Sequence, residues 1–117
     1  EMKNALLSRA RALLFPIQWE EPFGLVMIEA MACGTPVLAF AGGSVEEIVE
    51  DAVNGWVCRD VADMAAHITS LDVSAVTCRQ FAAMHFSVAR MAEQYVDLYE
   101  RILAGSGAPE SAAELEA

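Results

Sequence analysis

The sequence predicts an α/β domain built on a parallel sheet that is flanked by helices. Two short apolar runs, residues 12–16 and 37–40, are bounded by turn residues and are typical of strands buried on both faces. Residues 25–33 lie between them and are strong helix formers, so the spacing predicts a right-handed parallel βαβ unit. A third strand is expected at residues 56–58, directly after the turn Asn54-Gly55.

Helix start signals divide the rest of the N-terminal part into further elements. Residues 3–11 are typical of the end of a helix. Ser44, followed three residues later by Glu47, predicts a capping box that opens a short helix. Asp60 is expected to cap a helix over residues 61–70, because its carboxylate can accept a hydrogen bond from the first turn. Strands and helices thus alternate along the chain.

Two more helices are expected in the C-terminal part. Asp72 is a candidate cap for a helix that ends near Met84, and Ser87 is the candidate cap for the last helix, which Gly105 ends. The apolar residues of this last helix follow an amphipathic spacing, and its tyrosines are most simply interpreted as core residues. These residues are Val88, Met91, Ala92, Tyr95, Leu98, Tyr99 and Ile102. Residues 104–117 are expected to form a disordered acidic tail.

Length and charge exclude several classes of function. A chain of 117 residues is one domain at most. Seven basic and seventeen acidic residues give a net charge of −10, which disfavours nucleic acid as a partner because that interaction needs clustered Lys and Arg. No apolar run approaches the roughly 20 residues of a transmembrane helix, and no signal peptide or lipidation motif is recognised. We therefore expect a cytoplasmic protein.

The cysteines and histidines predict neither a metal site nor a cofactor site. Cys33, Cys58 and Cys78 match no zinc or redox motif and are interpreted as buried, reduced thiols. His67 and His85 are isolated as well. Because His, Cys and carboxylate residues form no cluster at ligand spacing, we expect no metal and no other cofactor.

The most informative segment of the sequence is residues 20–36. Pro22 has no N–H group and disfavours a helix at the preceding residue, so Glu21 is expected on a loop. Glu29 is the only charged residue of the helix that follows. Desolvating an unpartnered carboxylate costs on the order of several kcal/mol, so Glu29 needs a partner. That partner is either a ligand or a structural group such as Arg11 or a backbone N–H.

The same segment has the properties of a ligand-binding loop. Gly24 lets a ligand approach the backbone, and the helix N-terminus after it favours an anion. A carboxylate can accept hydrogen bonds from two vicinal hydroxyls, which suits a ribose. Ligands of open α/β sheets bind at the carboxyl ends of the strands, where this loop is expected. The turn at residues 42–44 follows the next strand and is expected to border the same crevice.

Four residues of this loop have structural interpretations that need no ligand. Trp19 and Phe23 are more often core anchors than platforms on which a base stacks. Glu20 is interpreted as a solvated charge, and the same alternative exists for Glu21.

Residues 21–37 resemble the signature of the group 1 glycosyl transferases, a large family of retaining enzymes with the GT-B fold. The matching residues read E-P-F-G-L and, from the second glutamate on, E-A-M-A-C-G-T-P-V. The signature has two glutamates that are separated by seven residues, as here. Further similarity at residues 42–49 and 54–57 extends the resemblance to about residues 12–103. It implies that residues 1–103 are the C-terminal part of a Rossmann-like domain that binds a nucleotide-sugar.

The resemblance also implies roles for individual residues. Glu21 would contact hydroxyls of the donor sugar and help to stabilise the positive charge that develops at the anomeric carbon. Glu29 would hold the ribose hydroxyls of the nucleotide. The backbone N–H groups of Phe23, Gly24 and Leu25 would face the donor sugar and the distal phosphate.

The implied function is retaining transfer of a hexosyl group from a nucleotide-diphosphate sugar to an acceptor, in carbohydrate biosynthesis. The family's phosphate-binding Arg and Lys and its N-terminal acceptor domain have no counterpart here, so we expect a fragment that is not catalytically competent alone. Glu46 stands where many relatives have proline. The alternative is a free-standing, non-catalytic module that binds nucleotides or a partner protein through its last helix. A small regulatory α/β domain would share only the fold.

Overall fold

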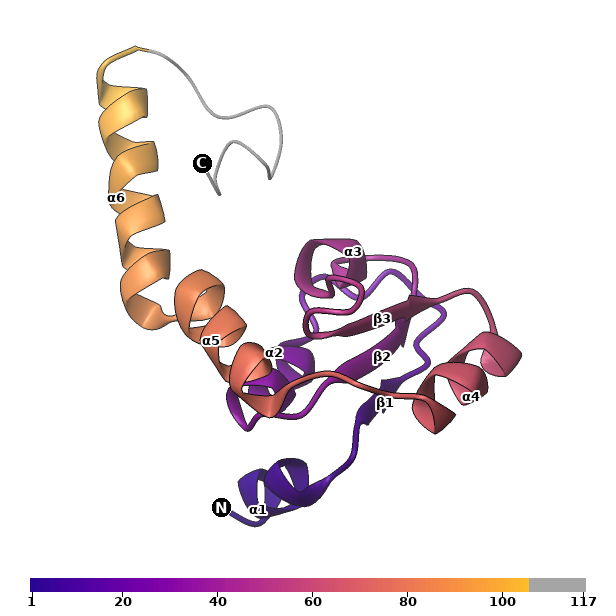
Figure 1. Cartoon of the computed structure of the whole chain (residues 1–117). Coiled ribbons are helices and arrows are strands. Elements are labelled where there is room, and N and C mark those ends of the chain that lie inside the picture. The colour runs from indigo at the N-terminus through magenta and orange to yellow at the C-terminus, as the bar shows by residue number, and fades with distance from the viewer. Residues whose placement is uncertain (106–117) are drawn as a thin grey trace. The chain divides into compact units, whose positions relative to one another are not determined.

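The computed structural model describes residues 1–105 and has three parallel strands at its centre (Figure 1). The pairing is parallel throughout, and Leu38 of the central strand lies opposite Leu14 on one side and Trp56 on the other. The predicted fold class, an α/β domain with a parallel sheet flanked by helices, is therefore confirmed. The strands follow one another across the sheet as β1 (Leu13–Phe15), β2 (Val37–Phe40) and β3 (Gly55–Cys58).

The helices of residues 1–105 belong to two compact units. The first unit, residues 1–82, contains the sheet and the helices up to the greater part of α5, and the second begins at residue 83 and contains α6. The helices are α1 (Met2–Arg9), α2 (Leu25–Ala32), α3 (Val45–Ile48), α4 (Val61–Thr69), α5 (Ala75–Phe86) and α6 (Val88–Leu103).

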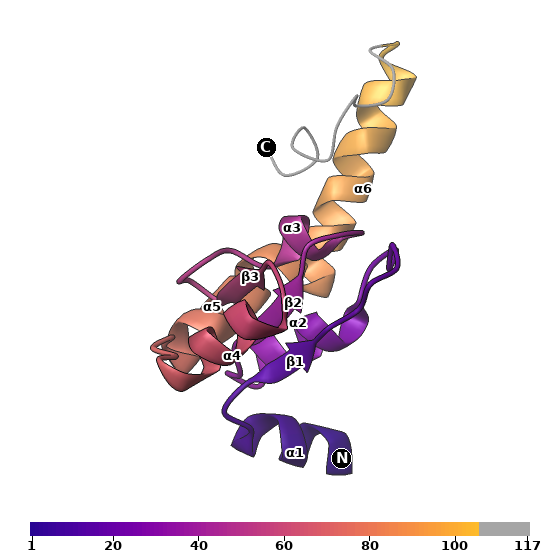
Figure 2. The ribbon, with the colours of Figure 1, turned by 90° about the vertical axis from the view of Figure 1, so that its right-hand side faces the viewer.

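Both faces of the central strand β2 are covered, as its apolar sequence predicts. Leu38 packs with Cys58 and with Met64 of α4 in one buried cluster. Because successive strand residues point to opposite faces, Val37 and Ala39 face the other side, which α2 covers with its buried methionines. Figure 2 shows α4 and α2 on either side of the strands. The central strand is therefore buried, whereas Leu14 of β1 is 48% exposed, so the prediction that the first strand is buried on both faces is wrong.

Two of the predicted helix caps are confirmed. The Asp60 carboxylate accepts a hydrogen bond from the Asp63 N–H at 2.8 Å and starts α4. The Ser87 hydroxyl accepts one from the Arg90 N–H at 3.1 Å and starts α6. Both bonds join residues three apart, so the local sequence is enough to predict them.

Two other predicted caps are wrong. Ser44 precedes α3 as predicted, but its hydroxyl accepts no capping bond and is directed toward the carbonyl of Phe23 in a neighbouring loop, to which it donates. Helix α5 starts later than expected, and its first turn is satisfied by Ser74, whose hydroxyl accepts from the Thr77 N–H at 3.3 Å. Asp72 therefore lies before the helix and does not cap it.

Helix α6 is amphipathic, but none of its residues is buried. Tyr95 and Tyr99 expose 53% and 58% of their surface, so their interpretation as core residues is wrong for this chain. Gly105 adopts a left-handed φ of +82°, and its N–H donates to the Ile102 carbonyl at 3.0 Å, which ends the helix as predicted. The expected tail lies outside the described residues from residue 106 on, and the division into residues 1–103 and 104–117 stays a prediction.

The three cysteines differ in their burial. All three cysteines are free, and Cys58 and Cys78 are buried as predicted. Cys33 is only partly buried, so the prediction is wrong for this residue, which lies at the exposed end of α2.

Within residues 1–105, no helix combines the length and the apolar character that crossing a membrane requires.

Candidate functional site

The loop between β1 and α2 lies at the carboxyl edge of the sheet and is held to the turn that follows β2. The Ser44 N–H donates to the carbonyl of Glu21 at 3.1 Å, and the Ser44 hydroxyl donates to the carbonyl of Phe23. The Gly43 N–H donates to the carboxylate of Glu20. The two segments that the sequence placed at one crevice are thus in direct contact.

Glycine is required where these two segments meet. Gly43 has a left-handed φ of +54°, and a Cβ atom there would lie 2.3 Å from the carbonyl oxygen of Glu21. Gly24, with a φ of +75°, is the N-cap residue of α2, and a Cβ there would lie 2.5 Å from the terminal methyl of Met27. Both positions need a conformation that L side chains rarely adopt. The close approach of the Gly43 backbone to that of Glu21 therefore depends on glycine.

The glycine turn after β2 has its N–H groups satisfied by two carboxylates. Glu20 is exposed as predicted, but it is hydrogen-bonded to the Gly43 N–H and is not simply solvated. The Glu46 carboxylate accepts from the Gly42 N–H at 2.6 Å. Glu46, which stands where many proteins with the resembling signature have proline, therefore stabilises the turn through a side-chain hydrogen bond.

The start of α2 presents three backbone donors without acceptors. Within residues 1–105, no acceptor meets the N–H groups of Phe23, Gly24 or Leu25. The first intrahelical bond runs from the Met27 N–H to the Gly24 carbonyl at 3.0 Å. Unpaired N–H groups at a helix N-terminus, together with the helix dipole, form a site that favours an anion.

The loop side chains are more exposed than the sequence predicts. Trp19 exposes 66% of its surface and Phe23 exposes 50%, so their interpretation as core anchors is wrong. The indole N–H of Trp19 donates to the Glu21 carboxylate at 3.1 Å. Both residues lie in the loop between the end of β1 and the start of α2, outside the strands. Glu21 is thus held at the edge by a neighbour in the same loop.

Glu29 has a partner that the sequence did not identify. Lys3 of α1 forms an ion pair with its carboxylate, whose side chain is 27% exposed. Arg11, the candidate weighed from the sequence, donates its Nε–H to the Ile68 carbonyl at 3.3 Å instead. Lys3 and Glu29 lie on different helices, so no local pattern could have predicted the pair.

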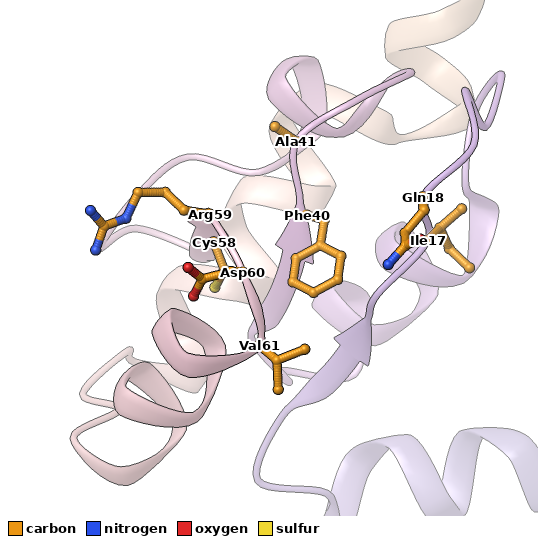
Figure 3. Close-up of a pocket in the computed structure, with 8 residues that line it drawn as sticks. All are labelled: Ile17, Gln18, Phe40, Ala41, Cys58, Arg59, Asp60 and Val61. Atoms are coloured by element: carbon orange, nitrogen blue, oxygen red, sulfur yellow. The ribbon is translucent and has the colours of Figure 1, made fainter.

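A hollow of about 390 Å³ lies at the carboxyl ends of the strands (Figure 3). Figure 3 shows Phe40 between Ile17 and Gln18 on one side and the residues that follow β3 on the other, with the guanidinium of Arg59 pointing away. None of the predicted site residues lines this hollow. Sequence reasoning missed it because its lining comes from three strand ends: Ile17, Gln18, Phe40, Ala41, Cys58, Arg59, Asp60 and Val61.

Charged groups beside this hollow bind one another. The Asp63 carboxylate accepts from the Arg59 N–H at 2.9 Å and from its guanidinium at 3.3 Å, and these bonds lower the pKa of Asp63. Burial raises the pKa of the Cys58 thiol, and the negative charge of Asp63 raises it further by a smaller amount. The His67 ring stacks on Trp56 with centroids 4.5 Å apart. Residues 1–105 contain no group of three His, Cys, Asp or Glu that could hold a metal ion.

The structure defines a parallel α/β protein with a candidate binding site at the carboxyl ends of its strands. Free N–H donors stand at the start of α2, and Glu29 follows on the same helix, about 6 Å further along its axis by the rise of an α-helix. Residues 1–80 match the family model described as "Glycosyl transferases group 1". The chain belongs to this family, as the resemblance implied.

The similar proteins are much longer than this chain. The α-maltose-1-phosphate synthase of Mycobacterium tuberculosis is 32% identical over 85% of this chain and 29% of its own length. A D-inositol 3-phosphate glycosyltransferase of Mycobacterium sp. is 42% identical over 66% of this chain and 18% of its own length. The crystal structure of AviGT4, a glycosyltransferase involved in avilamycin A biosynthesis, has a TM-score of 0.64 and 29% identity over 86% of this chain and 32% of its own. The chain spans less than a third of each relative.

Proposed function

We propose that this chain is the donor-binding part of a retaining glycosyltransferase, and that it binds a nucleotide-diphosphate sugar. Three features support the proposal: the family, the position of the loop at the carboxyl edge, and the free N–H groups at the start of α2. Those N–H groups carry the argument, because three donors without acceptors beside an exposed glycine loop suit the anionic end of such a donor.

In this proposal, each predicted residue has one task. The N–H groups of Phe23, Gly24 and Leu25 bind the distal phosphate and the donor sugar. Glu29 accepts hydrogen bonds from the two ribose hydroxyls, which its partly exposed carboxylate can reach. Glu21 binds sugar hydroxyls, and its negative charge stabilises the anomeric carbon as it becomes positive.

Catalysis by the whole enzyme would be mainly electrostatic. The hexosyl group leaves the nucleoside diphosphate, passes through a centre with oxocarbenium character, and joins an acceptor held by an N-terminal domain. Closure of that domain over the cleft would exclude water and strengthen these interactions. The proposal requires no metal ion and places the enzyme in the cytoplasm. The names of the relatives, a synthase of a sugar phosphate and a glycosyltransferase, support transfer of a sugar.

An amide-resolved NMR titration tests donor binding. The chain is titrated with uridine, guanosine and adenosine diphosphates and with their glucose conjugates. We expect shifts at residues 23–25 and at Glu29, stronger for one base than for the others. A dispersed spectrum that none of these compounds changes would contradict donor binding by this chain.

The variant Glu29→Ala tests the ribose contact. Because a hydrogen bond to a charged acceptor is strong, we expect nucleotide affinity to fall about tenfold or more. The melting temperature should stay near that of the parent chain, since an ion pair with a largely exposed lysine adds little stability. Glu47→Ala, which removes an exposed glutamate from α3, is the matched control. A large loss of stability with unchanged affinity would show that Glu29 is a structural residue.

A second candidate function has one observation in its favour. The apolar side of α6 is exposed, which suits a module that binds a partner protein. The coding sequence upstream of residue 1 distinguishes the two. An open frame that continues into a glycine-rich acceptor domain with an Arg and Lys pair supports the enzyme, whereas a start codon at or just before Met2 supports the module.

A further inference from the structure

The carboxylate of Glu29 is held by a cation from another helix. Lys3, in the first turn of α1, places its Nζ atom against Oε2 of Glu29. Through residue 105, this ion pair is the one polar contact that the structure gives to the Glu29 carboxylate. Its second oxygen, Oε1, is therefore left without a partner from those residues.

Stability does not explain this pair. The Lys3 side chain is 61% exposed, and ion pairs with such exposed lysines contribute little to stability. A glutamate side chain has several rotatable bonds, and the neighbours of Glu29 along α2 are apolar groups that cannot orient it. A bond to Oε2 fixes the direction of the carboxylate while Oε1 stays free to accept from a ligand.

The positive charge of Lys3 also favours binding of an anionic ligand beside Glu29. The chain carries a net charge of −10, and a nucleoside diphosphate is itself an anion. An unpaired Glu29 would repel that anion, whereas a carboxylate neutralised by Lys3 can accept hydroxyl protons at a smaller electrostatic cost.

We propose that Lys3 is a positioning residue, which orients and neutralises Glu29 so that its free oxygen accepts hydrogen bonds from the ribose hydroxyls of the nucleotide. This inference rests on the proposed function, because it assumes that Glu29 binds the ribose. It assigns a role to α1, an element that the sequence analysis did not place in the site.

The test compares ligands with and without the ribose hydroxyls. Binding of adenosine, guanosine and uridine diphosphates, and of the 2′,3′-dideoxy form of each, is measured by NMR titration for the parent chain, Lys3→Gln, Lys3→Arg and Arg9→Gln. Arg9→Gln is the matched control, because it removes one charge from the exposed surface of the same helix. A dispersed amide spectrum confirms that each variant is folded.

Lys3→Gln should weaken binding of the ribose form about tenfold and of the dideoxy form about twofold or less, since only the former uses Glu29. Lys3→Arg should recover most of the affinity, and Arg9→Gln should change neither ligand. Equal losses for both ligands would overturn the role, because Lys3 would then act on the diphosphate directly. Unchanged or tighter binding would overturn it as well. Failure of the parent chain to bind any of the nucleotides would instead contradict the proposed function, and the role of Lys3 with it.

Discussion

Single residues hold the two loops of the candidate site together. Gly43 approaches the backbone of Glu21 so closely that no side chain fits between them, and Ser44 donates two hydrogen bonds across the same contact. The site loop is thus positioned by the backbone of the neighbouring turn and by the Ser44 hydroxyl. The half-exposed or exposed rings of Phe23 and Trp19 are not buried in the core, although the Trp19 indole N–H donates to the Glu21 carboxylate.

The substitution Gly43→Ala should destabilise the chain by about 1–3 kcal/mol, because it adds a steric clash to left-handed backbone strain. Gly105→Ala is the control, since Gly105 is also left-handed but has nothing within 4 Å of an added Cβ. The control should cost about 1 kcal/mol, from backbone strain alone. Urea denaturation followed by circular dichroism measures both. Equal losses would show that the Gly43 contact does not limit stability.

For single residues, the sequence selects the loop of the candidate site but does not predict the contacts of its residues. Glu21, Gly24 and Glu29 could be selected because residue type and position along the chain point to a function. The partner of Glu29 could not, since Lys3 reaches it from another helix. Exposure of Trp19 also escaped prediction, because a large aromatic ring is buried in most folds.

Among the elements, α4 has the most clearly defined start. Asp60 caps its first turn, and Asp63 binds both the backbone N–H and the guanidinium of Arg59. These bonds stabilise the ionised form of Asp63 and lower its pKa. The stability that Asp63 contributes is therefore complete above the ordinary pKa of an aspartate, and it is lost as the pH falls through the lowered value.

We expect the urea midpoint of the chain to fall as the pH is lowered below the ordinary pKa of aspartate. In Asp63→Asn, which keeps the shape but cannot ionise, this fall should be smaller and the midpoint at neutral pH should be lower. Circular dichroism at a series of pH values measures both. Parallel curves for the two chains would show that Asp63 does not contribute to acid sensitivity.

The sequence predicted the elements well where the signals are local. The capping bonds of Asp60 and Ser87 span three residues, and both helices begin where the sequence places them. The capping box at Ser44 did not form, because the hydroxyl is directed toward the Phe23 carbonyl 21 residues away and accepts no hydrogen bond from the first turn of α3. Here a tertiary contact sets the orientation of a side chain whose local sequence predicts a different one.

For the molecule as a whole, the thiols report on the packing of the sheet unit. Cys58 is 1% exposed and Cys78 is fully buried, and burial raises the pKa of both thiols. Groups with a raised pKa contribute stability below their ordinary pKa, and that contribution is lost as the pH rises through the raised value. The folded chain should therefore lose stability at alkaline pH.

A thiol reagent should label Cys33 quickly in the native chain and label Cys58 and Cys78 only in urea. Cys33 is partly exposed, whereas the other two are held in the neutral, unreactive form inside the fold. Intact-mass analysis over time follows the labelling, and Cys33→Ser should remove the fast phase. Fast labelling of three thiols in buffer would show that the sheet unit opens readily.

The sequence by itself determined the alternation of strands and helices, the parallel sheet, and the loop that follows the first strand. These follow from apolar periodicity, from helix formers and from the residues Pro22 and Gly24, all of which act over a few neighbouring positions. Only the tertiary structure decided that Lys3 pairs with Glu29, that Glu20 binds Gly43, and that the aromatic residues of α6 are exposed. Such contacts depend on which distant segments meet in space, and no local pattern contains that information.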